Sequence, residues 1–99
     1  LATRQKSYEL IERRLELGMS NELDRAQART ALNICEGYTW RPGKRWVHHL
    51  RIAYGSAVET RECLRMLRDL GVAPEATIAP AIRATERVEG LLWGLIRRP

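Results

Sequence analysis

The chain has 99 residues, of which 44% are hydrophobic and 29% are charged, so it forms one domain and is not a disordered segment. It contains no Phe and only four Pro, while Arg, Leu, Ala and Glu are abundant, which favours helices over a sheet. Lys and Arg number 17 against 12 Asp and Glu, giving a net charge of +5, and two Cys are too few for a disulfide framework.

The first predicted helix covers roughly Thr3 to Leu17. Its main apolar stripe consists of Tyr8, Ile11 and Leu15. Gly18 tolerates a positive φ and is therefore predicted to end this helix. A turn at Met19-Ser20 would be short enough to force the next helix to run antiparallel.

The second predicted helix begins at Ser20 or Asn21, either of which can cap a helix, and ends near Gly37-Tyr38. The face that we predict to be inward is poor in large apolar groups, which favours close approach of another helix. The following turn covers Thr39 to Gly43, where Pro42 can start a helix but cannot continue one.

The third predicted helix is the longest, from Lys44 to Leu70, and Gly71 ends it. Its apolar seam consists of Trp46, Leu50, Ala53, Ala57, Thr60, Leu64 and Leu67. We predict that the fourth helix starts near Thr77, which puts Pro80 in the first turn, where a missing N–H does no harm.

These patterns predict an all-α fold, an antiparallel up-down-up-down four-helix bundle in a single domain over residues 1–99. Both cysteines fall inside helical patterns, which indicates small buried residues in a reducing, cytoplasmic compartment. The longest apolar run is about a third of what a membrane span needs, and we expect no signal peptide from Leu1 onward.

Five polar residues lie where the second and third predicted helices face each other: Arg25, Asn33, Glu36, Ser56 and Glu59. Antiparallel pairing about residue 41 places Glu59 near Arg25, so we expect Glu59 to be buried and to pair with Arg25 or a neighbouring donor. Glu36 would lie level with Trp46 to His49. A polar site is one interpretation, and mutual satisfaction that fixes the helix register is the simpler one.

No residue pattern indicates catalysis, a cofactor or a small-molecule substrate. Cys35, His48 and His49 could approach one another, but adjacent histidines point in different directions on a helix. A zinc site needs three or four converging ligands, so we predict no metal site. A Cys–His nucleophile would lack both an orienting acid and an anion hole.

The excess positive charge is concentrated in one segment. Residues 41–51 contain Arg41, Lys44, Arg45 and Arg51 without any acid, which accounts for +4 of the +5. Trp40 and Trp46 are interleaved with these cations, and basic groups beside aromatic rings suit phosphates and exposed bases. We predict a nucleic-acid contact here. The alternative is a solvated charged turn, with Trp46 in the core.

The central third of the chain resembles a known family. The segment Asn33-Ile34-Cys35-Glu36-Gly37-Tyr38 resembles the Asn-Ile-Ala-Glu-Gly-Tyr signature of small four-helix-bundle proteins encoded by intervening sequences within bacterial 23S rRNA genes. The stretch from Lys44 to Glu59 resembles the segment that follows in that family, and the segments ending at Gly71 and at Ile96 also fit. Departures from the family pattern include Cys35, Arg45 and His49.

The resemblance implies a homopentamer of four-helix bundles. A related protein, the accessory protein of diversity-generating retroelements, binds nucleic acid and a reverse transcriptase. The sequence and the resemblance together predict a non-enzymatic, oligomeric scaffold whose basic turn contacts RNA or DNA. The alternative is a purely structural or protein-binding oligomer without nucleic acid.

Overall fold

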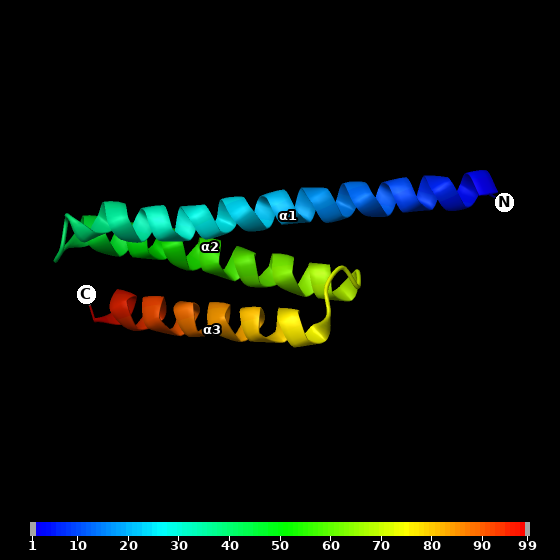
Figure 1. Ribbon diagram of the computed structural model, residues 1–99. Coiled ribbons are helices and arrows are strands. Elements are labelled where there is room, and N and C mark those ends of the chain that lie inside the picture. Colours follow the sequence, from blue (N-terminus) through cyan, green and yellow to red (C-terminus); the bar gives the residue numbers. More distant parts are fainter. Residues whose placement is uncertain (1, 99) are drawn as a thin grey trace.

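Three antiparallel helices form the part of the chain that the computed structural model describes, residues 2–98, with side chains described from Lys6 to Arg98 (Figure 1). Helix α1 covers Ala2–Tyr38, α2 covers Lys44–Asp69 and α3 covers Glu75–Arg97. These residues contain no strand, so the predicted all-α fold is confirmed. Across the same residues, no helix has both the length and the apolar character that crossing a bilayer requires.

The predicted break at Gly18 is wrong, and the four predicted helices are three. Helix α1 runs without interruption through Gly18, Met19 and Ser20. Gly18 does not adopt the positive φ that would end the helix. A glycine inside a helix costs about 1 kcal/mol relative to alanine, and the neighbouring helical turns can offset this cost. The N-terminal part of α1 therefore extends past the far ends of α2 and α3 instead of folding back (Figure 1).

Helix α2 lies between the other two and supplies most of the core. Its buried seam is Trp46, Leu50, Ala53, Ser56, Ala57, Thr60, Cys63, Leu64 and Leu67, which includes every residue of the predicted seam. One cluster joins Leu50 and Ala53 to Leu92 and Ile96 of α3, and a second joins Leu64 to Ile78. Among the described residues, no Cα of α1 lies within 8 Å of one in α3.

The ends of α2 and α3 follow local backbone chemistry. Gly71 has a left-handed conformation with φ +71°. The N–H of the next residue, Val72, donates to the Leu67 carbonyl, which is the hydrogen bond typical of a helix that ends at a left-handed glycine. Helix α3 begins at Glu75, two residues earlier than predicted, with Pro74 as its N-cap residue. Pro80 therefore lies in the second turn, where it leaves one helical hydrogen bond unmade.

Two helical glycines occupy opposite environments. A Cβ at Gly37 would lie 2.6 Å from the Cβ of His49 and 2.9 Å from the Trp46 ring, so α1 and α2 approach each other closely there. Gly55 is exposed, with nothing within 4 Å of a Cβ, so it is not a point of close helix approach. Gly37 is thus the glycine that the helix packing needs.

Alanine substitutions should separate these two positions. Gly55→Ala should raise the free energy of unfolding by about 0.5–1 kcal/mol, because alanine is the better helix former and has room. Gly37→Ala should lower it by about 1–3 kcal/mol, because the new methyl group would overpack the contact with His49. Urea unfolding followed by circular dichroism measures both, and equal effects of the two substitutions would contradict the close approach at Gly37.

Candidate nucleic-acid interface

The four predicted contact residues lie at one end of the molecule and are all exposed. Arg41 is in the turn after α1, Lys44 and Arg45 begin α2, and Arg51 follows two turns later. The turn contains a cis Arg41–Pro42 peptide and is held to α1 by backbone hydrogen bonds from Trp40 to Gly37 and from Arg41 to Tyr38. These hydrogen bonds fix the start of the turn relative to α1.

Two arginines of this segment stack on exposed aromatic rings. The Arg41 guanidinium carbon lies 3.2 Å from the centroid of the Tyr38 ring, and that of Arg45 lies 4.0 Å from Trp40. Tyr38 is 55% exposed and Trp40 48% exposed, so both pairs face solvent. Trp46 is buried, as predicted, and meets Tyr38 edge-on with ring centroids 6.3 Å apart. Tyr38, on which Arg41 stacks, thus packs against the buried Trp46.

Arg41 also has a structural role. Its Nε donates to the Tyr38 carbonyl over 3.0 Å and so satisfies a carbonyl at the C-terminal end of α1. This hydrogen bond and the stack on Tyr38 hold the guanidinium in place. A guanidinium carries five N–H donors, so others remain to bind a phosphate.

The start of α2 adds a second row of positive charge. Lys44, His48 and Arg51 are spaced four and three residues apart, which places them on one face of the helix, and all three are exposed. The first turn of α2 contains no acidic residue, and no side chain caps its N-terminus. The positive end of the helix dipole therefore reinforces the field of Lys44 and its neighbours.

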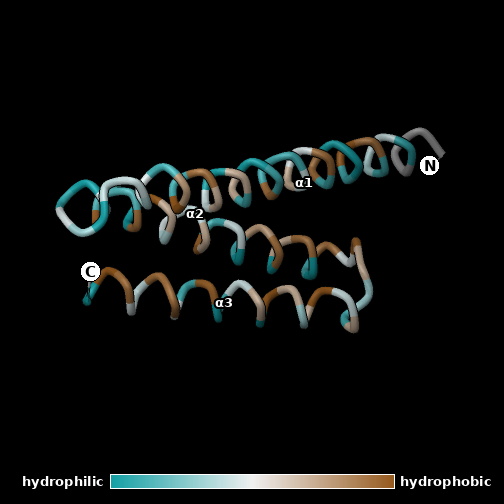
Figure 2. Tube along the Cα trace, turned by 60° about the vertical axis from the view of Figure 1, so that its left-hand side comes forward, coloured by the Kyte–Doolittle hydropathy of each residue, from teal (hydrophilic) through white to brown (hydrophobic). Residues whose placement is uncertain are grey.

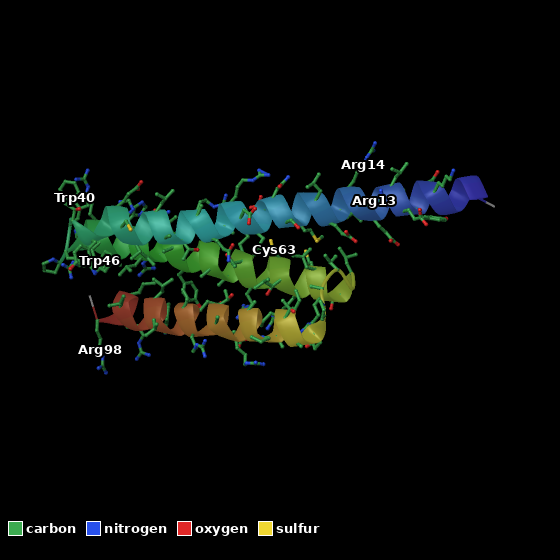
Figure 3. The ribbon with its side chains drawn as sticks, viewed as in Figure 1. Arg13, Arg14, Trp40, Trp46, Cys63 and Arg98 are labelled. Atoms are coloured by element: carbon green, nitrogen blue, oxygen red, sulfur yellow. The ribbon has the colours of Figure 1, made fainter. Side chains whose placement is uncertain are left out.

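Sequence reasoning missed two cations that the topology adds. The C-terminus of α3 lies at the same end of the molecule as the turn between α1 and α2 (Figures 1 and 3). Arg97 and Arg98, both exposed, therefore join the segment 41–51. The antiparallel order of the helices could have revealed this. We call this set the basic end, defined as Arg41, Lys44, Arg45, Arg51, Arg97 and Arg98.

Glu59 of α2 pairs with α1, and its partner is the second of the two predicted alternatives, a donor neighbouring Arg25. Arg29, not Arg25, pairs with Glu59, with its Nη2 2.6 Å from Glu59 and 2.9 Å from Glu22. Arg25 is exposed and lies 3.8 Å from Glu22. The Glu59 side chain is 43% exposed, so the prediction of a buried charge is wrong. The hydrogen bond from Arg29 holds the pKa of Glu22 below its usual range.

The remaining polar residues surround His49. The His49 Nδ1 lies 3.1 Å from the Asn33 side-chain oxygen and 3.9 Å from the Glu36 carboxylate, which agrees with the predicted level of Glu36. Asn33 also donates to the Arg29 carbonyl. Ser56 is buried, and its carbonyl accepts a hydrogen bond from the Thr60 hydroxyl. These contacts act both between α1 and α2 and within each helix.

A buried ion pair between α2 and α3 was also missed. Arg61 Nη1 lies 3.1 Å from Glu89 Oε1, and the Glu89 side chain is only 8% exposed. The other Glu89 oxygen and Arg61 Nε are buried without a hydrogen-bond partner. Burial raises the pKa of Glu89, and the nearby Arg61 partly offsets that effect. The apolar spacing of α3 gave no signal that a carboxylate would face the core.

The cysteines do not form a site. Cys63 is buried as predicted, whereas Cys35 is exposed, so the prediction for Cys35 is wrong. Burial raises the pKa of the Cys63 thiol, which makes it a poor nucleophile. Among the described residues, no three His, Cys, Asp or Glu side chains gather in a way that could hold a metal ion.

Comparison with known proteins gives one match. A family model with the description 23S rRNA-intervening sequence protein matches residues 3–94 of the chain. No curated protein and no solved structure matches. The match covers nearly the whole chain, including the turn and the exposed stacks.

The Arg61–Glu89 pair predicts a pH dependence. A carboxyl group whose pKa is raised in the folded state contributes stability that is lost as pH rises through that pKa. Glu89→Gln removes the group that titrates. The free energy of unfolding of the variant, minus that of the native chain, should therefore rise from about pH 4.5 to pH 7. Urea unfolding at both pH values measures this.

Glu62→Gln is the matched control, since Glu62 is half-exposed and also lies within 4 Å of Arg61. It should change the free energy of unfolding little at either pH. An equal response of the two variants to pH would show that Glu89 is not desolvated.

Proposed function

Because the chain belongs to the 23S rRNA-intervening sequence protein family, we propose that it is a non-enzymatic, self-associating protein that contacts RNA through its basic end. The observation that supports this proposal most directly is the pair of exposed stacks, Arg41 on Tyr38 and Arg45 on Trp40. Charge alone also occurs on a solvated turn. Exposed aromatic rings held beside guanidinium groups are what unpaired bases and their phosphates require.

The geometry suits a contact with the phosphate backbone. The arginines can donate two hydrogen bonds to one phosphate, and Lys44 and Arg51 extend the positive surface along α2. Contacts with phosphates position a protein on nucleic acid but carry no sequence information. The proposed contact is therefore strongly dependent on salt and weakly dependent on nucleotide sequence.

Self-association is the second part of the proposal, and exposed apolar side chains support it. Leu91 is 71% exposed, and Leu10, Leu17, Trp93 and Leu95 also face solvent. Soluble monomers rarely expose so much apolar surface. The family resemblance implies five copies of a four-helix bundle, and we place the assembly in the cytoplasm. In a ring of five, the basic ends would gather on one rim.

The competing hypothesis is an oligomer that binds only protein or serves only a structural role. The same exposed apolar side chains would support it, since they provide contact area without any nucleic acid. The two hypotheses differ at the basic end. Only RNA binding requires Arg41, Lys44 and Arg45 to be free to contact phosphates.

Fluorescence anisotropy with a short RNA and a short DNA of the same sequence tests the proposal. If about four phosphates are neutralised, the logarithm of affinity should fall with the logarithm of salt at a slope near −3 to −4. Replacing Arg41, Lys44 and Arg45 by Ser should flatten that slope, because three of the contacting cations are lost. The circular dichroism spectrum should be retained.

The matched control removes three cations from the other end of the molecule. Lys6, Arg13 and Arg14 are exposed on the N-terminal part of α1. Figure 3 shows Arg13 and Arg14 far from the turn between α1 and α2. Their replacement by Ser changes the net charge equally and should leave the salt slope unchanged. Absence of binding at tens of micromolar, or equal effects of the two triple variants, would favour the protein-binding hypothesis.

A further inference from the structure

A row of arginines runs along one face of α3. Arg83, Arg87 and Arg97 are exposed, and so are Gly90 and Gly94, which lie between the second and the third arginine. The five residues are spaced four, three, four and three positions apart, so they share one face of the helix. We call this set the arginine stripe.

The arginine stripe faces away from the core. Leu92 and Ile96 are buried against α2. Leu92 is nine residues from Arg83, and Ile96 is nine residues from Arg87, which is about two and a half helical turns in each case. The two arginines therefore lie on the side of α3 opposite the core. Figure 2 shows hydrophilic segments recurring between apolar ones along this helix.

The cations of the stripe are not used by the fold. Across the described residues, the side chains of Arg83 and Arg87 form no ion pair and no hydrogen bond. Arginines of α2 differ, since Arg61 lies 3.1 Å from Glu89 and Arg65 lies 3.2 Å from Glu62. The guanidinium donors of Arg83 and Arg87 are therefore available to a ligand.

The spacing of these two arginines points to an anionic ligand. Arg83 and Arg87 are four residues apart, and like charges at this spacing destabilise a helix. Glu86 is exposed beside them, but within the part of the chain that the structure describes it pairs with neither. The bundle thus gains no contact from the arginines, whereas a row of phosphates would offset their repulsion.

The arginine stripe ends in the basic end. Arg97 belongs to both sets, and Arg98 follows it at the end of the molecule where Trp40 also lies (Figure 3). Arg83 is about 21 Å from Arg97 along the helix axis. Between the outer arginines, Gly90 and Gly94 project no side chain, and nothing lies within 4 Å of a Cβ at either position. A polymer can therefore lie close to α3 along this face.

We propose that an RNA strand bound at the basic end continues along the arginine stripe, with its phosphates contacting Arg83 and Arg87. The inference rests on RNA binding in the proposed function, and it specifies the path of the strand. The stacks of Arg41 on Tyr38 and Arg45 on Trp40 suit unpaired nucleotides, so the strand that enters the stripe is single-stranded. Each arginine fork can donate two hydrogen bonds to one phosphate.

An acidic protein surface, including one on another copy of this chain, could also meet these cations. Continuity with the basic end favours RNA, because one polyanion can contact both sets of arginines without interruption. An acidic protein surface would explain the stripe but not the exposed aromatic rings beside Arg41 and Arg45.

Two RNA lengths test the path. An RNA of about 4 nucleotides covers the basic end alone, and one of about 16 nucleotides also reaches the stripe; these lengths span the site sizes of single-strand-binding folds. Arg83→Ser with Arg87→Ser should weaken binding of the long RNA about three- to tenfold, because two exposed ion pairs are lost. The slope of log affinity against log salt should become shallower by about 1.4. Fluorescence anisotropy should show unchanged binding of the short RNA.

Two further variants make the result specific. Arg13→Ser with Arg14→Ser removes the same charge from exposed positions on α1 and should leave binding of both RNAs unchanged. Arg83→Lys with Arg87→Lys keeps the charge and should retain the steeper salt slope of the long RNA. Circular dichroism should show native helicity in all these variants, since the substituted residues are exposed.

The outcomes separate this inference from the proposed function. If the native chain bound neither RNA, both would be overturned. If the triple variant at Arg41, Lys44 and Arg45 lost binding while the Arg83 and Arg87 variant bound the long RNA like the control, only the path along α3 would be overturned. A lower molar mass of the Arg83 and Arg87 variant in light scattering would show that the stripe contacts another copy, and would also overturn it.

Discussion

The packing of α2 between two helices whose Cα atoms stay more than 8 Å apart is the constraint on which the rest of the structure depends. The α2 seam from Trp46 to Leu67 must serve α1 on one side and α3 on the other. Gly37 lets α1 come within contact distance of His49 and Trp46. That approach fixes the end of α1, and with it the position of Tyr38, on which Arg41 stacks. The close packing at Gly37 therefore determines where the Arg41–Tyr38 part of the basic end lies.

The sequence predicted the parts of the fold that local chemistry dictates. The α2 seam and the end at Gly71 follow from apolar spacing and from the conformational freedom of glycine, and both are observed. Gly18 was misjudged because glycine permits a helix end without requiring one. At Gly71 the helix ends, and the Val72 N–H donates a hydrogen bond to the Leu67 carbonyl. Gly18, in contrast, keeps a helical conformation. Only contacts from outside α1 could have decided between these outcomes at Gly18.

Prediction of the candidate interface had a similar limit. Composition located the cations of residues 41–51, since charge is visible in a sequence. The stacks on Tyr38 and Trp40 and the addition of Arg97 and Arg98 depend on how the chain turns and returns. The choice of Arg29 over Arg25 as partner of Glu59 is a shift of one helical turn, finer than a crude antiparallel estimate resolves. Glu89 faces the core because Arg61 lies opposite, which no single helix pattern reveals.

The two ends of α1 differ in chemistry, and this difference separates assembly from ligand contact. At its C-terminal end, α1 leads into a turn with cations and exposed rings, where affinity would depend on salt. At its N-terminal end, α1 exposes Tyr8, Ile11 and Leu15, and any association through these side chains would be hydrophobic and would depend little on salt. Helix α1 is 37 residues long, about 55 Å, which is several times the screening length at physiological ionic strength. Charges at one end thus have little direct influence on contacts at the other.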